Sequence, residues 1–173
     1  DSRPVMIVID NEKTYSFEID KLQMIKKIYD KIGKQIESYI QNTVKGFAYK
    51  TKDFDTIFNI EFQKIVLYYR GLLTKKYITE NDARLMDYLG REFYTFYFSK
   101  LQGNIIKKKK LIIKPSGVLS ILPFEVFITP EGRRLVEKYE IKYTCSYTTT
   151  EKASGRNYKP SKTIFVFGDP VYG

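Results

Sequence analysis

The chain has 173 residues, of which 43% are hydrophobic and 16% aromatic, so it is long and apolar enough to bury a core. It carries 30 basic and 20 acidic residues, giving a net charge of +10, with no histidine and one cysteine. These counts exclude an internal disulfide and a zinc site built from the usual ligands. No apolar stretch approaches the roughly 20 residues of a membrane-spanning helix. The single cysteine fits a reducing compartment, so we expect a cytoplasmic chain.

The first 73 residues predict a hairpin followed by two helices. Short apolar runs at 5–9 and 14–19 are separated by turn-forming residues, which indicates a β-hairpin. Asp20 is suited to cap a helix, and apolar residues at helical spacing over 22–40 predict a long amphipathic helix. A second helix is predicted over 54–73.

A polar stretch at 46–53 predicts a loop between these two helices. A third helix is predicted to begin after Thr79, because Asp82 follows three residues later, at capping-box spacing. Its apolar stripe runs from 85 to 97. Three amphipathic helices need an apolar surface to cover, and a sheet is the obvious candidate.

The second half of the chain predicts strands separated by turns. A run of lysines at 107–110 precedes a strand at 111–114, which ends in a turn at 115–117. A short helical turn is predicted from Pro123, and residues 130–133 form another turn. The lysine run is typical of a solvated loop, with a nucleic-acid contact as the alternative.

Two further strands are expected after the turn at 130–133. Alternating aromatic and aliphatic residues predict a strand-like stretch over 135–143, and a hydrophilic connector follows at 148–161. The last strand, 163–167, is rich in β-branched and aromatic residues, as in strands buried on both faces. We therefore expect it to need neighbouring strands from polypeptide outside this sequence. The order of elements predicts an α/β fold with a mixed sheet.

Few residues have the chemistry of a reactive site. A nucleophilic thiol needs a basic or cationic partner, so we interpret Cys145 as a structural cysteine, with a reactive thiol as the alternative. Asp10, Glu12 and Asp20 could form only a weak oxygen site, and a hairpin turn is the simpler explanation of the first two. No phosphate-binding glycine loop is present. We therefore expect no metal and no cofactor.

The end of the last strand and the positive charge each have two interpretations. Gly168-Asp169-Pro170 follows the strand at the edge where α/β proteins bind ligands, so Asp169 is either a pocket residue or part of a strand-ending turn. The excess of lysine indicates either a solubility device or a surface for an acidic protein partner. No nucleic-acid motif is present, so we expect no direct contact with nucleic acid.

Four segments, in this order, resemble the CHAT domain, a family of caspase-like cysteine peptidase domains related to separase. They are LIIKPSG at 111–117, LPFEVF at 122–127, EGRRLVEKYEIKYTCS at 131–146 and FVFGDP at 165–170. Ser116 stands where the family has an aspartate in the first turn. The resemblance implies a caspase-like mixed sheet flanked by helices, incomplete in this chain, because the family's catalytic histidine and cysteine lie downstream of the last segment.

The resemblance also implies a division of the chain and a function. Residues 1–150 would form an N-terminal, pseudo-peptidase-like lobe, 151–162 a linker, and 163–173 the first strand of the catalytic lobe. The chain would be the non-catalytic N-terminal portion of a cysteine endopeptidase that cleaves a protein substrate in bacterial defence. It would then contain no catalytic residue of its own, and Asp169 would border the substrate pocket.

The partners that the resemblance implies are proteins. They are the remaining catalytic part of the same protein, a protein substrate, and the TPR helices and CRISPR-linked or gasdermin partners that accompany such domains. No membrane partner is expected. The alternative function is a non-catalytic protein-interaction module with a degenerate CHAT-like lobe, which is what a chain without histidine provides on its own.

Overall fold

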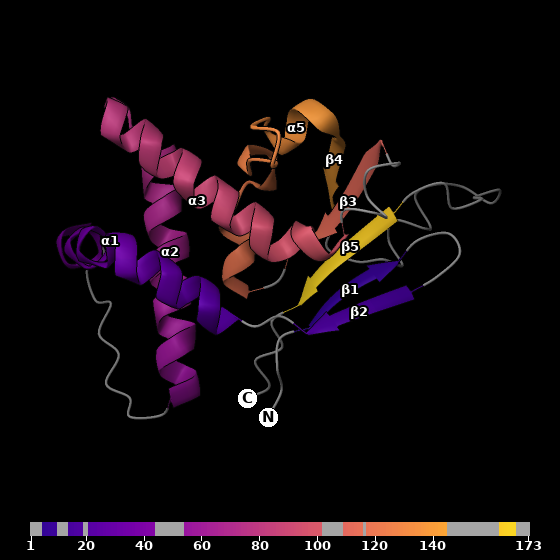
Figure 1. Cartoon of the computed structure of the whole chain (residues 1–173), viewed down its shortest axis with the longest axis horizontal. Helices are drawn as coiled ribbons and strands as arrows, with labels where there is room; N and C mark the ends of the chain where they lie inside the picture. Colours follow the sequence, from indigo (N-terminus) through magenta and orange to yellow (C-terminus); the bar gives the residue numbers. More distant parts are fainter. Residues whose placement is uncertain are drawn as a thin grey trace.

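The computed structural model describes the backbone of residues 5–9, 14–18, 21–43, 54–101, 109–115, 117–144 and 163–168. It contains a five-stranded mixed sheet, with the three long helices gathered to one side of it (Figure 1). The strands are β1 (Val5–Ile9), β2 (Thr14–Glu18), β3 (Lys110–Lys114), β4 (Glu140–Tyr143) and β5 (Thr163–Gly168). The helices are α1 (Lys21–Thr43), α2 (Phe54–Leu73), α3 (Glu80–Phe98) and α5 (Leu135–Lys138), with 3₁₀ turns η1 (Ser99–Leu101), η2 (Gly117–Ile121) and η3 (Phe124–Val126).

The strand order is β2-β1-β5-β3-β4. β1 pairs with β2 in antiparallel register, which confirms the predicted hairpin. β5 lies between β1, to which it is antiparallel, and β3, to which it is parallel. The expectation that the last strand needs neighbours from outside this sequence is therefore wrong. Both neighbouring strands, β1 and β3, come from this chain. The sequence does not indicate that β1 pairs with β5, because almost the whole chain lies between them.

The three long helices form where the apolar periodicity predicts them. In α1 the buried side chains recur every three or four residues, so one face of the helix is continuously apolar. These residues are Met24, Ile25, Ile28, Ile32, Ile36 and Ile40. The helix is kinked at Ile32, which has φ −136° and ψ 15°. α2 and α3 begin and end close to their predicted bounds, so the mixed α/β class is confirmed.

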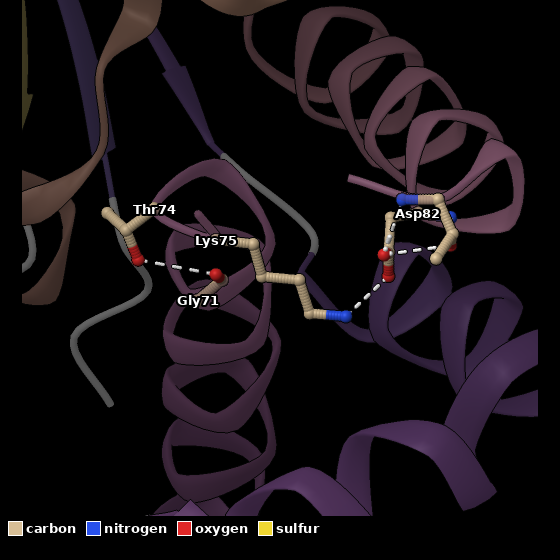
Figure 2. Close-up of polar contacts among 5 residues, drawn as sticks. Gly71, Thr74, Lys75 and Asp82 are labelled. Atoms are coloured by element: carbon tan, nitrogen blue, oxygen red, sulfur yellow. Dashed lines mark hydrogen bonds and ion pairs between the residues drawn. The ribbon is translucent and has the colours of Figure 1, made fainter. Parts of the chain in front are cut away.

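The connection between α2 and α3 is held by polar contacts (Figure 2). The Thr79 hydroxyl accepts the Asp82 backbone N–H at 3.1 Å, and Asp82 Oδ2 accepts the Thr79 N–H at 3.1 Å, so the predicted capping box is confirmed. Lys75 Nζ lies 2.6 Å from Asp82 Oδ1. At the end of α2, the Thr74 hydroxyl donates to the Gly71 carbonyl at 3.2 Å. These bonds fix both ends of a short loop.

Aromatic rings fill the core between the helices and the segment that follows β3. The Phe93 ring on α3 stacks with Tyr69 at 5.5 Å and with Phe127 at 5.4 Å between centroids. The ring centroids of Phe124 and Phe127 lie 4.9 Å apart, and both side chains are fully buried. The LPFEVF segment therefore supplies rings to the helical core. Residues of β3 belong to the same buried cluster, so the helices do pack against the sheet, as predicted.

The strand predicted over 135–143 is wrong in its first half. Residues Leu135–Lys138 form the short helix α5, and only Glu140–Tyr143 form a strand. The Glu137 carboxylate accepts the Arg134 N–H at 3.0 Å and caps the turn. The Leu135 N–H donates to the Phe127 carbonyl at 2.8 Å, which holds this buried residue against the core. The alternation of aromatic and aliphatic residues is a strand signal only from 140 onward.

Some sequence-based expectations lie outside the described residues. They concern Asp10, Glu12, Asp20, the stretch 46–53, Lys107 and Lys108, Ser116, Cys145, the connector 148–161 and Asp169. Among the described helices, none combines the length and hydrophobicity needed to cross a bilayer. Within the same residues, no group of three His, Cys, Asp or Glu side chains is placed to hold a metal ion.

Candidate functional site at the carboxyl edge of the parallel strands

Three parallel strands end at one edge of the sheet. β3 is flanked by β4 and β5, and Ile113 stands opposite Tyr143 on one side and Phe165 on the other. The carboxyl ends of these strands, at Lys114, Tyr143 and Gly168, therefore share this edge. Open α/β sheets bind their ligands outside the carboxyl ends of parallel strands. This edge is the candidate functional site.

A hydrogen-bonded cluster fastens the η3 turn to the end of β4. The Tyr143 hydroxyl donates to Glu125 Oε2 at 2.5 Å and accepts the Phe124 backbone N–H at 2.8 Å. Tyr143 remains 45% exposed, whereas Phe124 is completely buried. The cluster therefore lies at the boundary between the aromatic core and the solvent-facing edge.

The electrostatics of the cluster keep Tyr143 protonated. Burial raises the pKa of Tyr143 above its ordinary value, and the hydrogen bond to the Glu125 carboxylate raises this pKa further. The Phe124 N–H opposes the shift by stabilising the phenolate. The Tyr143 phenol is consequently a hydrogen-bond donor at neutral pH and does not act as a general base. Its chemical role here is to position the turn beneath the edge.

The turn after β3 depends on a glycine. Gly117 has φ +56°, a backbone conformation that side chains disfavour, which fits the glycine of the predicted turn at 115–117. The Ser120 hydroxyl donates to the Gly117 carbonyl at 2.7 Å. Beside it, the Thr144 N–H donates to the Ile113 carbonyl at 3.0 Å and continues the β3–β4 pairing by one residue. The described part of the edge is thus held by hydrogen bonds at both β3 and β4.

The residues that the sequence singled out are not brought together within the described structure. Asp169 and Cys145 lie outside the described residues, so the pocket role of Asp169 stays a prediction. The Glu125–Tyr143 pair was missed by sequence reasoning. Glu125 belongs to the LPFEVF segment and Tyr143 to the predicted strand, but no local pattern links two side chains 18 positions apart.

A comparison with protein-family models gives a match over the second half of the chain. The CHAT domain model matches residues 87–173, which is half of the chain and includes α3 from its middle, all three parallel strands and the η3 turn. The chain therefore belongs to the CHAT domain family. Comparisons with curated proteins and with solved structures gave no match.

Proposed function

We propose that this chain is the N-terminal, non-catalytic portion of a caspase-like CHAT cysteine endopeptidase that cleaves a protein substrate in bacterial defence. The observation that carries the proposal is the family match over 87–173, which covers the parallel strands and their carboxyl edge. In α/β proteins this edge is where substrate sites form. In the proposed enzyme, Asp169 after β5 would border the substrate pocket.

A cysteine peptidase with this composition would take its catalytic pair from polypeptide outside residues 1–173. A cysteine peptidase needs a thiolate and a base that passes its proton to the leaving amine, and imidazole is the usual base. Residues 1–173 contain no histidine. We propose that the histidine and the nucleophilic cysteine belong to polypeptide outside these residues, and that β3, β4 and β5 form the scaffold beside them.

The absence of histidine also supports the second candidate, a non-catalytic protein-interaction module. In that case the carboxyl edge binds a partner and cleaves nothing, and the Glu125–Tyr143 cluster only shapes its surface. Both candidates use the same edge of the sheet. They differ in whether the complete protein has a cysteine whose removal abolishes cleavage.

The test begins with the coding sequence beyond Gly173. The peptidase proposal expects a histidine at the end of one later strand and a cysteine at the end of another. The extended protein is then incubated with a peptide library, and new peptide ends are identified by mass spectrometry. Cleavage that disappears in the Cys→Ala and His→Ala variants supports the enzyme. If the pair is absent, or cleavage persists in both variants, the peptidase proposal fails.

A further inference from the structure

Strand β4 lies at one end of the described sheet. Among the described strands, its neighbour is β3 alone. The N–H groups of Glu140 and Thr144 donate to backbone carbonyls on the β3 side, at 2.8 Å and 3.0 Å. Because backbone groups alternate in direction along a strand, the N–H and C=O groups of Ile141 and Tyr143 point away from β3. This row of backbone groups is the outer edge of β4.

The outer edge of β4 is exposed. The side chains of Glu140 and Lys142 are 44% and 56% exposed, and Tyr143 is 45% exposed. No described residue forms a hydrogen bond with the outward N–H of Ile141 or of Tyr143. An exposed row of N–H and C=O groups is a template for a further strand, and several protein families bind an extended segment of a partner in this way.

The two faces of β4 differ in chemistry. Ile141 packs against the helical core, and the Tyr143 hydroxyl bonds Glu125, so these two strand residues lie on the side of the long helices. Side chains alternate along a strand, so Glu140 and Lys142 lie on the opposite face, away from α1, α2 and α3 (Figure 1). A strand added to β4 would therefore meet an apolar row on one face and a charged row on the other.

Lysine dominates the charged row. β3 contributes Lys110 and Lys114, which lie on the face opposite to its core residues. Lys110 Nζ lies 2.8 Å from Glu140 Oε2, and Lys142 Nζ lies 3.3 Å from Glu140 Oε1. One carboxylate thus serves two ammonium groups, and no described carboxylate pairs with Lys114, which is partly exposed. Three lysines against one glutamate leave this row with a net charge of +2.

The backbone edge and the charged row together select the kind of partner. An acidic polypeptide in extended conformation can pair with the backbone groups and place carboxylates opposite the lysines. A nucleic acid matches the charge but has no alternating N–H and C=O groups to continue the sheet. A second copy of this chain would bring the same excess of lysine to the contact, and like charges opposed across strands are destabilising.

We propose that the outer edge of β4 binds an acidic, extended segment of a protein partner as an added strand. Carboxylates of this segment face Lys142, with the positive charge of Lys110 and Lys114 behind it. Apolar residues alternate with the carboxylates and lie beside Ile141 and the Tyr143 ring. Purely apolar strands are disfavoured, because charged residues on an edge strand oppose unselective pairing. This inference goes beyond the proposed function and does not require cleavage.

The test is binding of short labelled peptides to the chain, measured by fluorescence anisotropy. The probe is a capped heptapeptide of alternating glutamate and valine, EVEVEVE. The control EEVVVEE has the same composition and charge without the alternation, and KVKVKVK has the alternation with the opposite charge. We expect EVEVEVE to bind and both controls to bind at least roughly tenfold more weakly, because each control loses one face of the complementarity.

Backbone N-methylation separates strand pairing from attraction by charge. Successive residues of a paired strand point their N–H groups in opposite directions, so either the valine or the glutamate N–H groups of EVEVEVE face β4. Methylating the facing set should weaken binding roughly tenfold or more, because each methyl group removes a donor. Methylating the other set should leave the affinity within about twofold. These peptides test the proposal without any change to the protein.

Three variants of the chain test the charged row. Lys142→Glu should weaken the binding of EVEVEVE roughly tenfold, and Lys114→Glu, which breaks no described ion pair, should weaken it to a smaller degree. The matched control is Lys76→Glu, which makes the same change of charge at an exposed position on the α2–α3 loop and should retain binding. Circular dichroism confirms that each variant is folded.

Several results would overturn the proposal. They are no binding of EVEVEVE, equal binding of EEVVVEE, equal binding of both methylated peptides, or equal losses in Lys76→Glu and Lys142→Glu. Tighter binding of a single-stranded RNA of equal charge would assign the lysine row to nucleic acid instead. Self-association of the chain that Lys142→Glu abolishes would assign the outer edge of β4 to a second copy.

Discussion

The hydroxyl of Tyr143 donates a hydrogen bond of 2.5 Å to Glu125, although the two residues belong to different elements 18 positions apart. The same hydroxyl accepts the Phe124 N–H at 2.8 Å. One side chain at the end of β4 thus forms hydrogen bonds with both a carboxylate and a backbone N–H of the LPFEVF segment. The family match covers this contact, and the contact places the η3 turn at the carboxyl edge of the parallel strands.

Removing the Tyr143 hydroxyl should destabilise the chain. In Tyr143→Phe the Phe124 N–H and the Glu125 carboxylate lose their partner, and we expect the free energy of unfolding to fall by about 1–2 kcal/mol. Urea denaturation measures this change. The matched control is Tyr77→Phe, because Tyr77 is 79% exposed and no hydrogen bond joins its hydroxyl to a described residue. Equal stability of the two variants would show that the cluster contributes nothing.

The aromatic core should be the most sensitive part of the fold. Phe127 is fully buried and stacks with Phe93 at 5.4 Å. We expect Phe127→Ala to lower the free energy of unfolding by about 3–5 kcal/mol, and Phe127→Leu by less, because truncation leaves a cavity. The control Val136→Ala, at a residue 53% exposed, should change it by less than about 0.5 kcal/mol. A loss below about 1 kcal/mol for Phe127→Ala would contradict this core assignment.

Asp82 should make stability dependent on acid pH. The hydrogen bond from Lys75, followed by those from Thr79, lowers the pKa of Asp82 from its ordinary 3.8 to about 2. Because the folded pKa is the lower one, the stabilisation is present above 3.8 and is lost as pH falls towards 2. Urea midpoints measured across this range should show the advantage of the unmodified chain over Asp82→Asn shrinking with acidification.

Lys75→Gln provides the internal check on this pH dependence. It removes the largest cause of the shift, so the pKa of Asp82 should return towards its ordinary value and the dependence should weaken. An advantage over Asp82→Asn that stays constant from neutral pH to pH 2 would contradict the assigned shift.

Replacing Gly90 even by alanine should lower the stability of the chain. A Cβ at this position would lie 3.0 Å from the Tyr69 hydroxyl oxygen and 3.2 Å from the Val126 carbonyl oxygen. Alanine favours helices over glycine by about 1 kcal/mol, yet we expect Gly90→Ala to destabilise the chain by about 1–3 kcal/mol through crowding. Thermal unfolding, compared with the exposed neighbour variant Arg91→Ala, measures this effect. A stabilised Gly90→Ala would contradict the close packing.

Local patterns in the sequence predicted the elements well. The hairpin of β1 and β2, the long helices and the Thr79 capping box depend on neighbouring residues, and the structure confirms them. Errors arose where distant parts of the chain decide the structure. The Phe127 carbonyl holds Leu135 in α5, and β1 closes one side of β5. The Glu125–Tyr143 contact could not be predicted for the same reason, because the periodicity of one segment does not indicate which distant segment it contacts.

The claim that substrate binds at the carboxyl edge of the parallel strands is tested most directly by crosslinking from the two ends of one strand. A photoreactive residue is placed at Lys114 or at Lys110, the last and first residues of β3, in the protein extended beyond Gly173. A peptide that this protein cleaves is then added and illuminated. The account predicts crosslinks from position 114 and none from position 110. Crosslinks only from position 110, or equally from both positions, would contradict it.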